Sequence, residues 1–369
     1  MKKGLIAFLL LCLFAAGAAA QPRTYIFGGS GDDRLEDIAV SDDGRIVMTG
    51  YTTSADGTLA GRTKTGHSGW ALCIDGQGNV LWSFCSRQGK EDTVRAPVFH
   101  EDGSVSVVLD SKTYEGTSAM ELIRLDAKGE VISRKTMRET VGDNALTLDG
   151  ATRAGYVLSE WEHMAPCLFC GLYGWDGAFI REVSMHCVGV SYQHTLYRDE
   201  NGGALYAIDE QGVEMPLASW TRRENEYEYG LISLSDGGAA AIRDMHDDSK
   251  EPLRLLHWDA QGDLVCDEQI EGLNRGNTSL CQTGKGLAMA YCLEDSSLDD
   301  GEEWYSWHLA FFDTQGRQTG TLPIGSAIYS CEAAALPDGG VVAVQPFVVE
   351  SVGMLCDVRV SVVPAEDIP

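Results

Sequence analysis

The sequence predicts an all-β protein, a β-propeller of seven blades, with six blades as the alternative. Two turn signals alternate along the chain, and short apolar runs flank each of them. Within these runs apolar residues stand two apart, as Val105, Val107 and Leu109 do, which is the period of a half-buried strand. The second signal recurs at a step of about 50 residues, close to the length of one four-stranded propeller blade.

Residues 1–20 carry the pattern of a cleaved secretory signal. Two lysines precede an apolar run from Leu5 to Phe14, and three alanines stand before Gln21. The apolar run is shorter than the roughly 20 residues that a membrane-spanning helix needs. We therefore expect residues 21–369 to form a single propeller domain with no membrane span, in a secreted or extracytoplasmic (cell-envelope) location.

The two turn signals differ in their spacing. The first is an Asp-Gly, Asn-Gly or similar pair before an apolar run, and the second is D-x-x-G after one. Asp-Gly suits a two-residue hairpin, in which both central residues take positive φ. The first signal places its glycine at Gly44, Gly103, Gly155, Gly202, Gly237, Gly286 and Gly339, and the second ends at Gly78, Gly129, Gly177, Gly212, Gly262 and Gly316.

The two ends of the chain complement each other. The last unit has two strand-like runs after Asp338-Gly339 but no D-x-x-G turn and no strand behind it. The segment from Arg23 to Gly28 precedes the first Asp-Gly much as Trp82 to Phe84 precedes the second. We predict that this N-terminal strand completes the last blade, which closes the ring and removes an open sheet edge. The unit from about Ser191 to Trp220 is short, so six blades result if it forms no sheet of its own.

The first repeat contains several short motifs in a fixed order. They are Gly28 to Asp33 (GGSGDD), Ile38-Ala39, Asp43-Gly44, Thr49 to Thr52, Trp70, Asp75 to Gly78 and Trp82. This order resembles the secreted bacterial β-propeller repeats of the SBBP and delta-60 type, and the match is best over this first repeat. The resemblance implies an extracytoplasmic propeller and brings no shared catalytic residues.

The charge balance limits the partners. The chain has 28 basic and 55 acidic residues, a formal net charge of −27. Such a surface repels nucleic acid and anionic lipid unless a local basic patch intervenes, and the sequence has no such run. We expect a monomer that binds no nucleic acid.

Strands alternate in direction, so the tight turns lie on one face of the ring and the long connections on the other. Loops on a rigid scaffold commonly carry function, which favours the long-loop face. The candidate ligand-binding residues there are Trp161, Glu162, His163, Trp304 and Tyr305. Aromatic faces beside carboxylates suit sugar rings, and they also suit a cationic peptide.

Neither a metal nor a cofactor is expected. The acidic stretches Asp244 to Glu251 and Glu294 to Glu303 lack the glycine of an EF-hand, and solvated loops explain them. The chain has 11 cysteines, and Cys12 lies in the predicted signal, which leaves ten (11 − 1). An exported chain can join such cysteines as disulfides, but several stand in apolar runs where a free thiol packs equally well.

No catalytic motif of the G-x-S-x-G, H-E-x-x-H or Walker A kind occurs. The sequence therefore favours a non-catalytic binding module for a glycan or protein ligand. A propeller-type carbohydrate-active hydrolase or lyase is the alternative, and it requires carboxylates, Arg and Tyr that converge on the central mouth. A structural component of a surface assembly is the third hypothesis.

Overall fold

The computed structural model describes residues 22–59, 67–86, 91–112, 117–141, 144–161, 167–183, 196–199, 204–209, 211, 213–219, 226–245, 253–270, 279–294, 305–327, 331–348 and 355–369. These residues form 27 β-strands and two 3-10 helices of one turn each, and no α-helix. The fold is thus all-β, as the alternation of apolar residues predicts.

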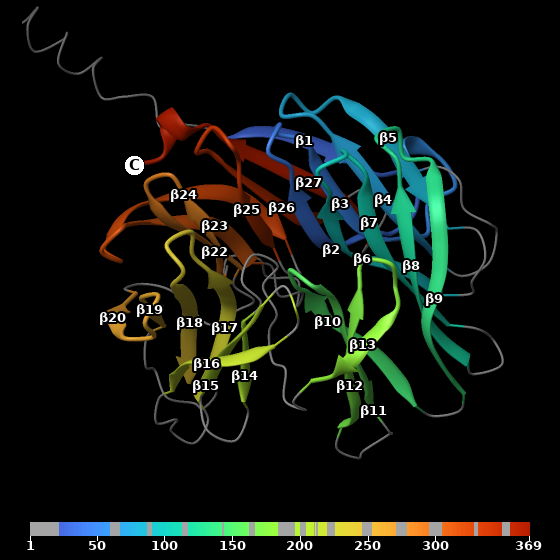
Figure 1. Cartoon of the computed structure of the whole chain (residues 1–369). Helices are drawn as coiled ribbons and strands as arrows, with labels where there is room; N and C mark the ends of the chain where they lie inside the picture. Colours follow the sequence, from blue (N-terminus) through green and yellow to red (C-terminus); the bar gives the residue numbers. More distant parts are fainter. Residues whose placement is uncertain are drawn as a thin grey trace, which may run out of the picture.

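Six sheets contain four antiparallel strands each, and one sheet contains three (Figure 1). Blade 1 consists of β2 (Asp33–Val40), β3 (Ile46–Thr52), β4 (Ser68–Ile74) and β5 (Val80–Cys85). Blade 2 consists of β6 (Glu91–Phe99), β7 (Val105–Lys112), β8 (Thr117–Leu125) and β9 (Val131–Val141). Blade 3 consists of β10 (Ala145–Ala151), β11 (Gly155–Trp161), β12 (Cys167–Gly174) and β13 (Phe179–Glu182).

The three-stranded sheet follows, with β14 (Leu196–Asp199), β15 (Ala204–Ile208) and β16 (Glu214–Ser219). Blade 4 consists of β17 (Glu226–Ser233), β18 (Ala239–Met245), β19 (Arg254–Trp258) and β20 (Leu264–Gln269). Blade 5 consists of β21 (Ser279–Thr283), β22 (Gly286–Glu294), β23 (Tyr305–Asp313) and β24 (Gln318–Ala327). Blade 6 consists of β25 (Glu332–Ala335), β26 (Val341–Val348), β27 (Cys356–Val363) and, from the other end of the chain, β1 (Arg23–Phe27).

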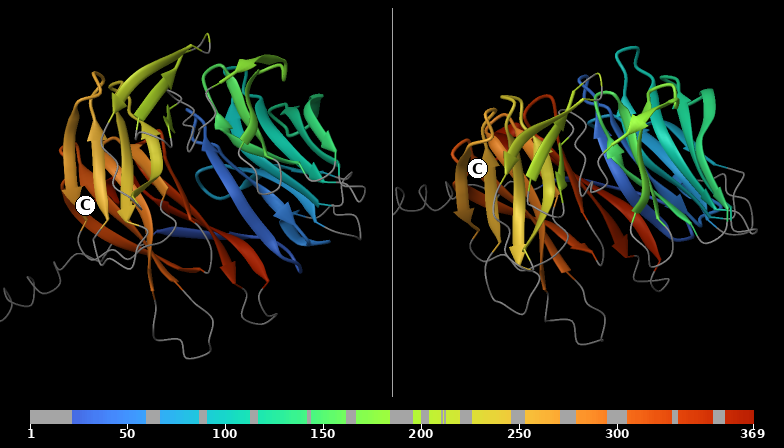
Figure 2. Two further views of the ribbon diagram at one scale, coloured as in Figure 1. Left: turned by 90° about the horizontal axis from the view of Figure 1, so that it is seen from below. Right: turned by 60° about the horizontal axis from the view of Figure 1, so that its bottom comes forward.

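The sheets stand side by side around a central axis (Figure 2). The first strand of each blade is innermost: β25, β2, β6 and β10 contact one another in turn, and so do β17, β21 and β25. The protein is therefore a β-propeller with six four-stranded blades. Among the described residues no helix has the length and apolar character to cross a membrane.

The predicted closure of the ring is confirmed. β1 pairs antiparallel with β27, with Arg23 opposite Val362 and Phe27 opposite Val358. Phe27 is 6% exposed and belongs to a buried apolar layer that includes Val360 of blade 6 and Met48 of blade 1. The first described strand thus joins the two ends of the chain and also contributes to the packing between two blades.

The prediction of seven blades, with the fourth one shortened, is not supported. Within the described residues the short unit has three strands, and its Asp209 turn has the pattern of the turns between third and fourth strands elsewhere. β14, β15 and β16 therefore correspond to the second, third and fourth strands of a blade. Gly212 follows Gly177 by 35 positions (212 − 177), against about 50 for the other units, so this unit is shorter than a full blade.

The tight turns are longer than the two-residue hairpins that the Asp-Gly pairs predict. In the Asp43-Gly44 turn between β2 and β3, Ser41 N donates to Arg45 O and Gly44 N donates to Ser41 O, each at 2.9 Å. The D-x-x-G turn between β8 and β9 has the same pattern: Asp126 N donates to Glu130 O at 2.8 Å and Gly129 N donates to Asp126 O at 3.0 Å. Only the glycine has positive φ, at 80°, which is typical of a type I turn followed by a left-handed glycine. The Asp126 carboxylate accepts the N–H groups of Lys128 and Glu130, so this aspartate fixes the turn from within.

The same glycine packs against the preceding blade. A Cβ on Gly129 would lie 2.8 Å from ring atoms of Trp82, on the outer strand β5 of blade 1. Gly78 approaches Tyr25 on β1, and Gly316 approaches the Cys266 sulfur on β20 in the same manner. The D-x-x-G turn therefore serves two purposes, as a hairpin and as the contact between successive blades.

The cysteines pack as apolar residues. Cys73, Cys266, Cys281, Cys292 and Cys331 are free thiols, and all five are buried. Trp70, Trp82 and Trp258 are buried in the blades, as the sequence predicts for tryptophans of strands.

Candidate functional site: the central channel

A cavity lies at one mouth of the central channel. Its volume is about 830 Å³, and its walls come from the inner strands β2, β6, β17, β21 and β25. Turn residues such as Asp43, Gly103 and Ser235 form its rim, so this mouth opens on the tight-turn face. A second cavity of about 420 Å³ lies between β2, β6 and β10 and shares Ile38, Pro97 and Val98 with the first.

Charged side chains from three inner strands line or adjoin the second cavity. Arg95 on β6 pairs with Glu36 on β2, with 3.2 Å between Nη2 and Oε2. The neighbouring Asp37 carboxylate accepts the Ala96 N–H at 2.9 Å. Asp149 on β10 faces the same cavity. The channel thus gathers charges that are more than one hundred positions apart in the sequence.

The backbone at Ala96 is strained. Its φ is 46°, and it is the one non-glycine residue with positive φ in the part of the chain that the structure describes. Ala96 lies at a bulge where the β6–β7 register shifts between Arg95 and Val98. The conformation aims its N–H at Asp37 and its carbonyl at the Tyr156 hydroxyl, at 3.3 Å. Strain of this kind and β-bulges both concentrate at functional sites.

Burial changes the acidity of the channel carboxyls. It raises the pKa of Asp149 to about 7, although the Ser159 hydroxyl and the Cys170 thiol donate hydrogen bonds to that carboxyl. It raises the pKa of Glu332 on β25 to about 8, and the nearby Asp37 charge adds to the effect. Near neutral pH these two groups therefore exchange protons readily.

Three further carboxyls in or near the channel have raised pKa values. Burial raises the pKa values of Glu36, Asp37 and Asp110, and the Arg95 guanidinium opposes each of these increases. Asp110 Oδ1 on β7 is buried and has no hydrogen-bond partner among the described groups. Three carboxyls, Glu36, Asp37 and Asp110, thus share the Arg95 guanidinium, so their oxygens can accept further hydrogen bonds.

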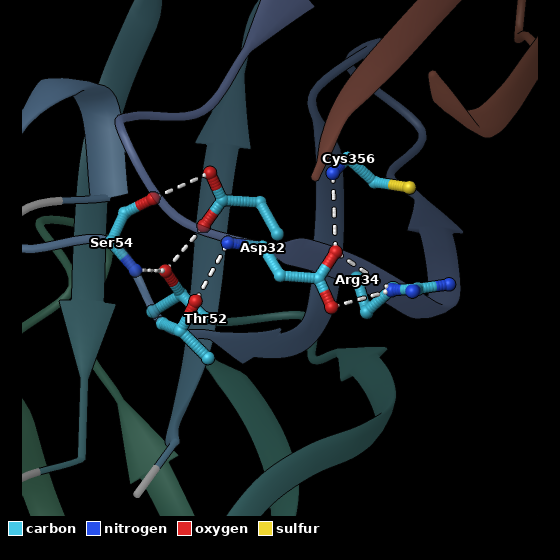
Figure 3. A network of polar contacts seen from close by, with 7 residues as sticks. Asp32, Arg34, Thr52, Ser54 and Cys356 are labelled. Atoms are coloured by element: carbon cyan, nitrogen blue, oxygen red, sulfur yellow. Dashed lines mark hydrogen bonds and ion pairs between the residues drawn. The ribbon is translucent and has the colours of Figure 1, made fainter. Parts of the chain in front are cut away.

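The GGSGDD motif forms a different network, which joins blade 6 to blade 1 (Figure 3). Asp32 accepts from the Arg34 guanidinium and from the Cys356 N–H at 3.1 Å, and its own N–H donates to Thr53 Oγ1 at 2.6 Å. The adjacent Asp33 is fully buried and accepts from the Thr52 and Ser54 hydroxyls. All these groups have partners, so the motif stabilises the junction of the two blades.

The second repeat reproduces this arrangement with other residues. Asp92 accepts from Ser86 Oγ and Ser111 Oγ, each at 2.6 Å. Asp92 stands opposite Ser111 in the β6–β7 register, as Asp33 stands opposite Thr52 in β2–β3. The role of GGSGDD is therefore structural and does not depend on its exact sequence.

Of the residues predicted for the long-loop face, the structure describes the backbone of two, Trp161 and Tyr305. Trp161 ends β11 in blade 3 and is 37% exposed. Tyr305 begins β23 in blade 5, and blade 4 and the three-stranded sheet separate these two blades in chain order. Glu162, His163 and Trp304 lie outside the described residues. No group of three or more His, Cys, Asp or Glu residues suited to a metal occurs in the described ranges.

The channel carboxyls were not among the residues predicted from the sequence, although the positions of two of them relative to the tight turns indicate where they lie. Asp37 and Glu332 each stand seven positions before the glycine of a tight turn (44 − 37 and 339 − 332). Inner strands run in the same direction around the ring, so an equal offset from the turn places two residues at the same depth in the channel. The charge of Asp37 raises the pKa of Glu332, as expected if the two carboxyls lie at the same depth.

Comparison with known proteins identifies the fold only. No family model and no curated protein matches the chain. A solved protein of unknown function from Dyadobacter fermentans is 8% identical, with a TM-score of 0.50, and the match covers 94% of this chain and 100% of that one. A fungal alcohol oxidase in complex with copper is 12% identical, with a TM-score of 0.50 and coverage of 94% and 77%. The WD40 domain of SCAP from fission yeast is 9% identical, with a TM-score of 0.43 and coverage of 94% and 96%.

Proposed function

We propose that this protein is an extracytoplasmic binding module that takes a glycan or protein ligand at the tight-turn mouth of its central channel. The observation that carries the proposal is the convergence of Glu36, Asp37 and Asp149 with Arg95 on the second cavity, which shares wall residues with the cavity at that mouth. A buried carboxyl that keeps its proton donates a hydrogen bond, and an ionised one accepts hydrogen bonds from hydroxyl or ammonium groups. Sugar hydroxyls and lysine side chains offer those donors.

The extracytoplasmic location rests on the sequence. Residues 1–20 have the pattern of an export signal, and the first repeat resembles repeats of secreted bacterial propellers. A mass measurement of the protein expressed with residues 1–20 and recovered from the cell exterior or periplasm tests this directly. Cleavage before Gln21 supports export, and an uncleaved chain in the cytoplasm contradicts it.

The binding proposal is tested with glycan and peptide arrays. We expect the protein to retain a defined set of ligands, and Asp37→Asn to weaken their binding at least tenfold, because it removes a charge that the channel presents. The control is Glu130→Gln, an exposed residue of the β8–β9 turn, which should bind as the wild type does. Equal binding by all three proteins would contradict a channel site.

The long-loop hypothesis is tested in the same experiment. Trp161→Ala leaves the channel intact and removes the one predicted aromatic side chain that the structure shows to be exposed. Loss of binding in Trp161→Ala, with normal binding in Asp37→Asn, would place the ligand on the long-loop face.

A carbohydrate-active enzyme is the second candidate, and one observation favours it. Asp149 and Glu332, with pKa values of about 7 and about 8, share the channel with Asp37, and general acid–base catalysis uses a protonated and an ionised carboxyl together. New reducing ends or unsaturated products from a polysaccharide panel, abolished in Glu332→Gln, would establish this activity. A panel that remains intact would favour the binding module.

A further inference from the structure

Arg359 on β27 lies well away from the channel, because β27 is the third strand from the axis in blade 6. Its guanidinium reaches toward blade 5, where Nη1 lies 3.5 Å from the Ser326 carbonyl on β24. One face of the guanidinium stacks on Phe347, at 3.9 Å from the ring centroid. The position between the two blades is partly buried.

This arginine has no counter-ion among the described residues. Burial lowers its pKa, and no charge of a described residue contributes. Other arginines pair with Asp or Glu, namely Arg34, Arg45, Arg95, Arg124, Arg134, Arg138, Arg181 and Arg254. In a chain with 55 acidic and 28 basic residues, an uncompensated, partly buried guanidinium is unexpected, because burying a charge without a partner is costly.

The nearest acid in the sequence does not fill this role. Asp357 stands two residues earlier on β27, but its carboxyl lies against the loop at Gly28, where a Cβ would be 1.9 Å from its Oδ1. Its pKa rises to about 6 through burial and the charge of Asp33, with no effect from Arg359. Asp357 therefore does not neutralise the charge of Arg359.

The backbone of β24 makes room for the guanidinium. Gly325 has φ +118°, and a Cβ there would lie 2.0 Å from Arg359 Nη1. The β23–β24 register shifts at this point, between Trp307 and His308. A bulge with glycine is a recurrent way to fit a backbone around a functional side chain.

Neighbouring polar atoms are also left without partners. Gln345 stands opposite Arg359 in the β26–β27 register, and Ser361 is the next residue on the same face. Both are 1% exposed, and neither Gln345 Oε1 nor Ser361 Oγ has a hydrogen bond among the described groups. Native proteins rarely leave such atoms unsatisfied, so this position between the blades has unused polar capacity.

We propose that Arg359, Phe347 and Gly325 form a binding site for a carboxylate group between blades 5 and 6. A planar guanidinium with one face covered by an aromatic ring presents its N–H edge, which matches the two oxygens of a carboxylate. A single guanidinium in a strongly acidic protein favours a monoanion over a dianion such as phosphate. The site is independent of the function proposed for the channel.

The test uses glucuronate as the carboxylate probe, glucose as its neutral counterpart and sulfate as a tetrahedral anion, all in chloride buffer. We expect glucuronate to raise the melting temperature of the wild type and to give a saturable titration by calorimetry. Glucose and sulfate should have a much smaller effect. Arg359→Met keeps the aliphatic packing and removes the charge, so it should lose the response and melt no lower than the wild type without ligand.

Two further variants separate the site from general anion effects. Arg134→Met removes an arginine paired with Glu121 and should keep the glucuronate response. Gly325→Ala retains Arg359 but fills its space, and it should lose the response. The proposal is overturned if glucuronate acts no better than glucose or sulfate, or if Arg359→Met responds as the wild type does. A much lower melting temperature of unliganded Arg359→Met would also overturn it, because it would show that Arg359 is a packing residue.

Discussion

At the scale of single residues, two turn glycines allow the cost of the left-handed backbone to be measured separately from the cost of packing between blades. Gly44 and Gly129 both have positive φ, at 82° and 80°. A Cβ on Gly44 would meet nothing within 4 Å, whereas a Cβ on Gly129 would lie 2.8 Å from the Trp82 ring. Both positions therefore need a left-handed backbone, but only Gly129 packs closely against another blade.

Gly44→Ala should cost about 1 kcal/mol of unfolding free energy, because alanine must adopt a left-handed conformation. Gly129→Ala should cost this amount plus the displacement of the Trp82 ring, about 1–3 kcal/mol more. Chemical denaturation of the two variants and the wild type measures the difference. Equal destabilisation of both would contradict the close packing of the D-x-x-G turns on the preceding blade.

The channel carboxyls predict a pH dependence of stability. The pKa values of Asp149 and Glu332 are raised in the folded state, to about 7 and about 8. The folded protein therefore binds more protons than the unfolded chain between about pH 4 and pH 8. The stability from these groups is complete below the unfolded pKa values and is lost as the pH rises through the folded ones.

We expect the unfolding free energy to fall from pH 5 to pH 9. The loss is about 1.4 kcal/mol for each unit by which the pKa of a carboxyl in the folded protein exceeds its pKa in the unfolded chain, over this pH range. Glu332→Gln and Asp149→Asn keep the hydrogen-bonding shape without a titrating group, so the double variant should show a flatter pH profile in denaturant titrations. A profile as steep as that of the wild type would show that other groups cause the loss.

At the scale of elements, β1 contributes to the ring through one buried face. Phe27 is 6% exposed, whereas its neighbour Ile26 is 51% exposed. Phe27→Ala should destabilise the fold by about 3–5 kcal/mol, because it leaves a cavity between blades 6 and 1. Ile26→Ala, on the outer face of the same strand, should change stability by about 0.5 kcal/mol or less. Similar values for both in thermal or urea unfolding would contradict the closure through β1.

The elements show how far the sequence alone can lead. Alternating apolar residues and the two turn signals predict the strands, and the missing strand of the last unit predicts the pairing of β1 with β27. The turn type predicted for the Asp-Gly pairs was wrong, because in the Asp43-Gly44 turn Gly44 N donates to Ser41 O and the glycine alone has positive φ. The seven-blade prediction was wrong because a repeated turn signal marks a unit but does not show whether that unit has residues enough for four strands.

At the scale of the whole molecule, the candidate site could not be predicted from neighbouring residues. Asp37, Arg95, Asp149 and Glu332 belong to four inner strands of four blades and meet only when the ring closes. They stand in four separate stretches of the sequence. The aromatic residues of the long loops are conspicuous in sequence, whereas the cavity of about 830 Å³ at the channel mouth opens on the opposite, tight-turn face.

If ligands enter the channel at its tight-turn mouth, a bulky side chain that blocks this mouth should abolish binding. Ala334 lines the larger cavity, so Ala334→Trp fills the opening and leaves every channel carboxyl in place. Ala127→Trp adds the same side chain to an exposed turn. For ligands that the wild type retains on an array, we predict that Ala334→Trp loses binding and Ala127→Trp keeps it. Undiminished binding by a folded Ala334→Trp protein would contradict the channel site.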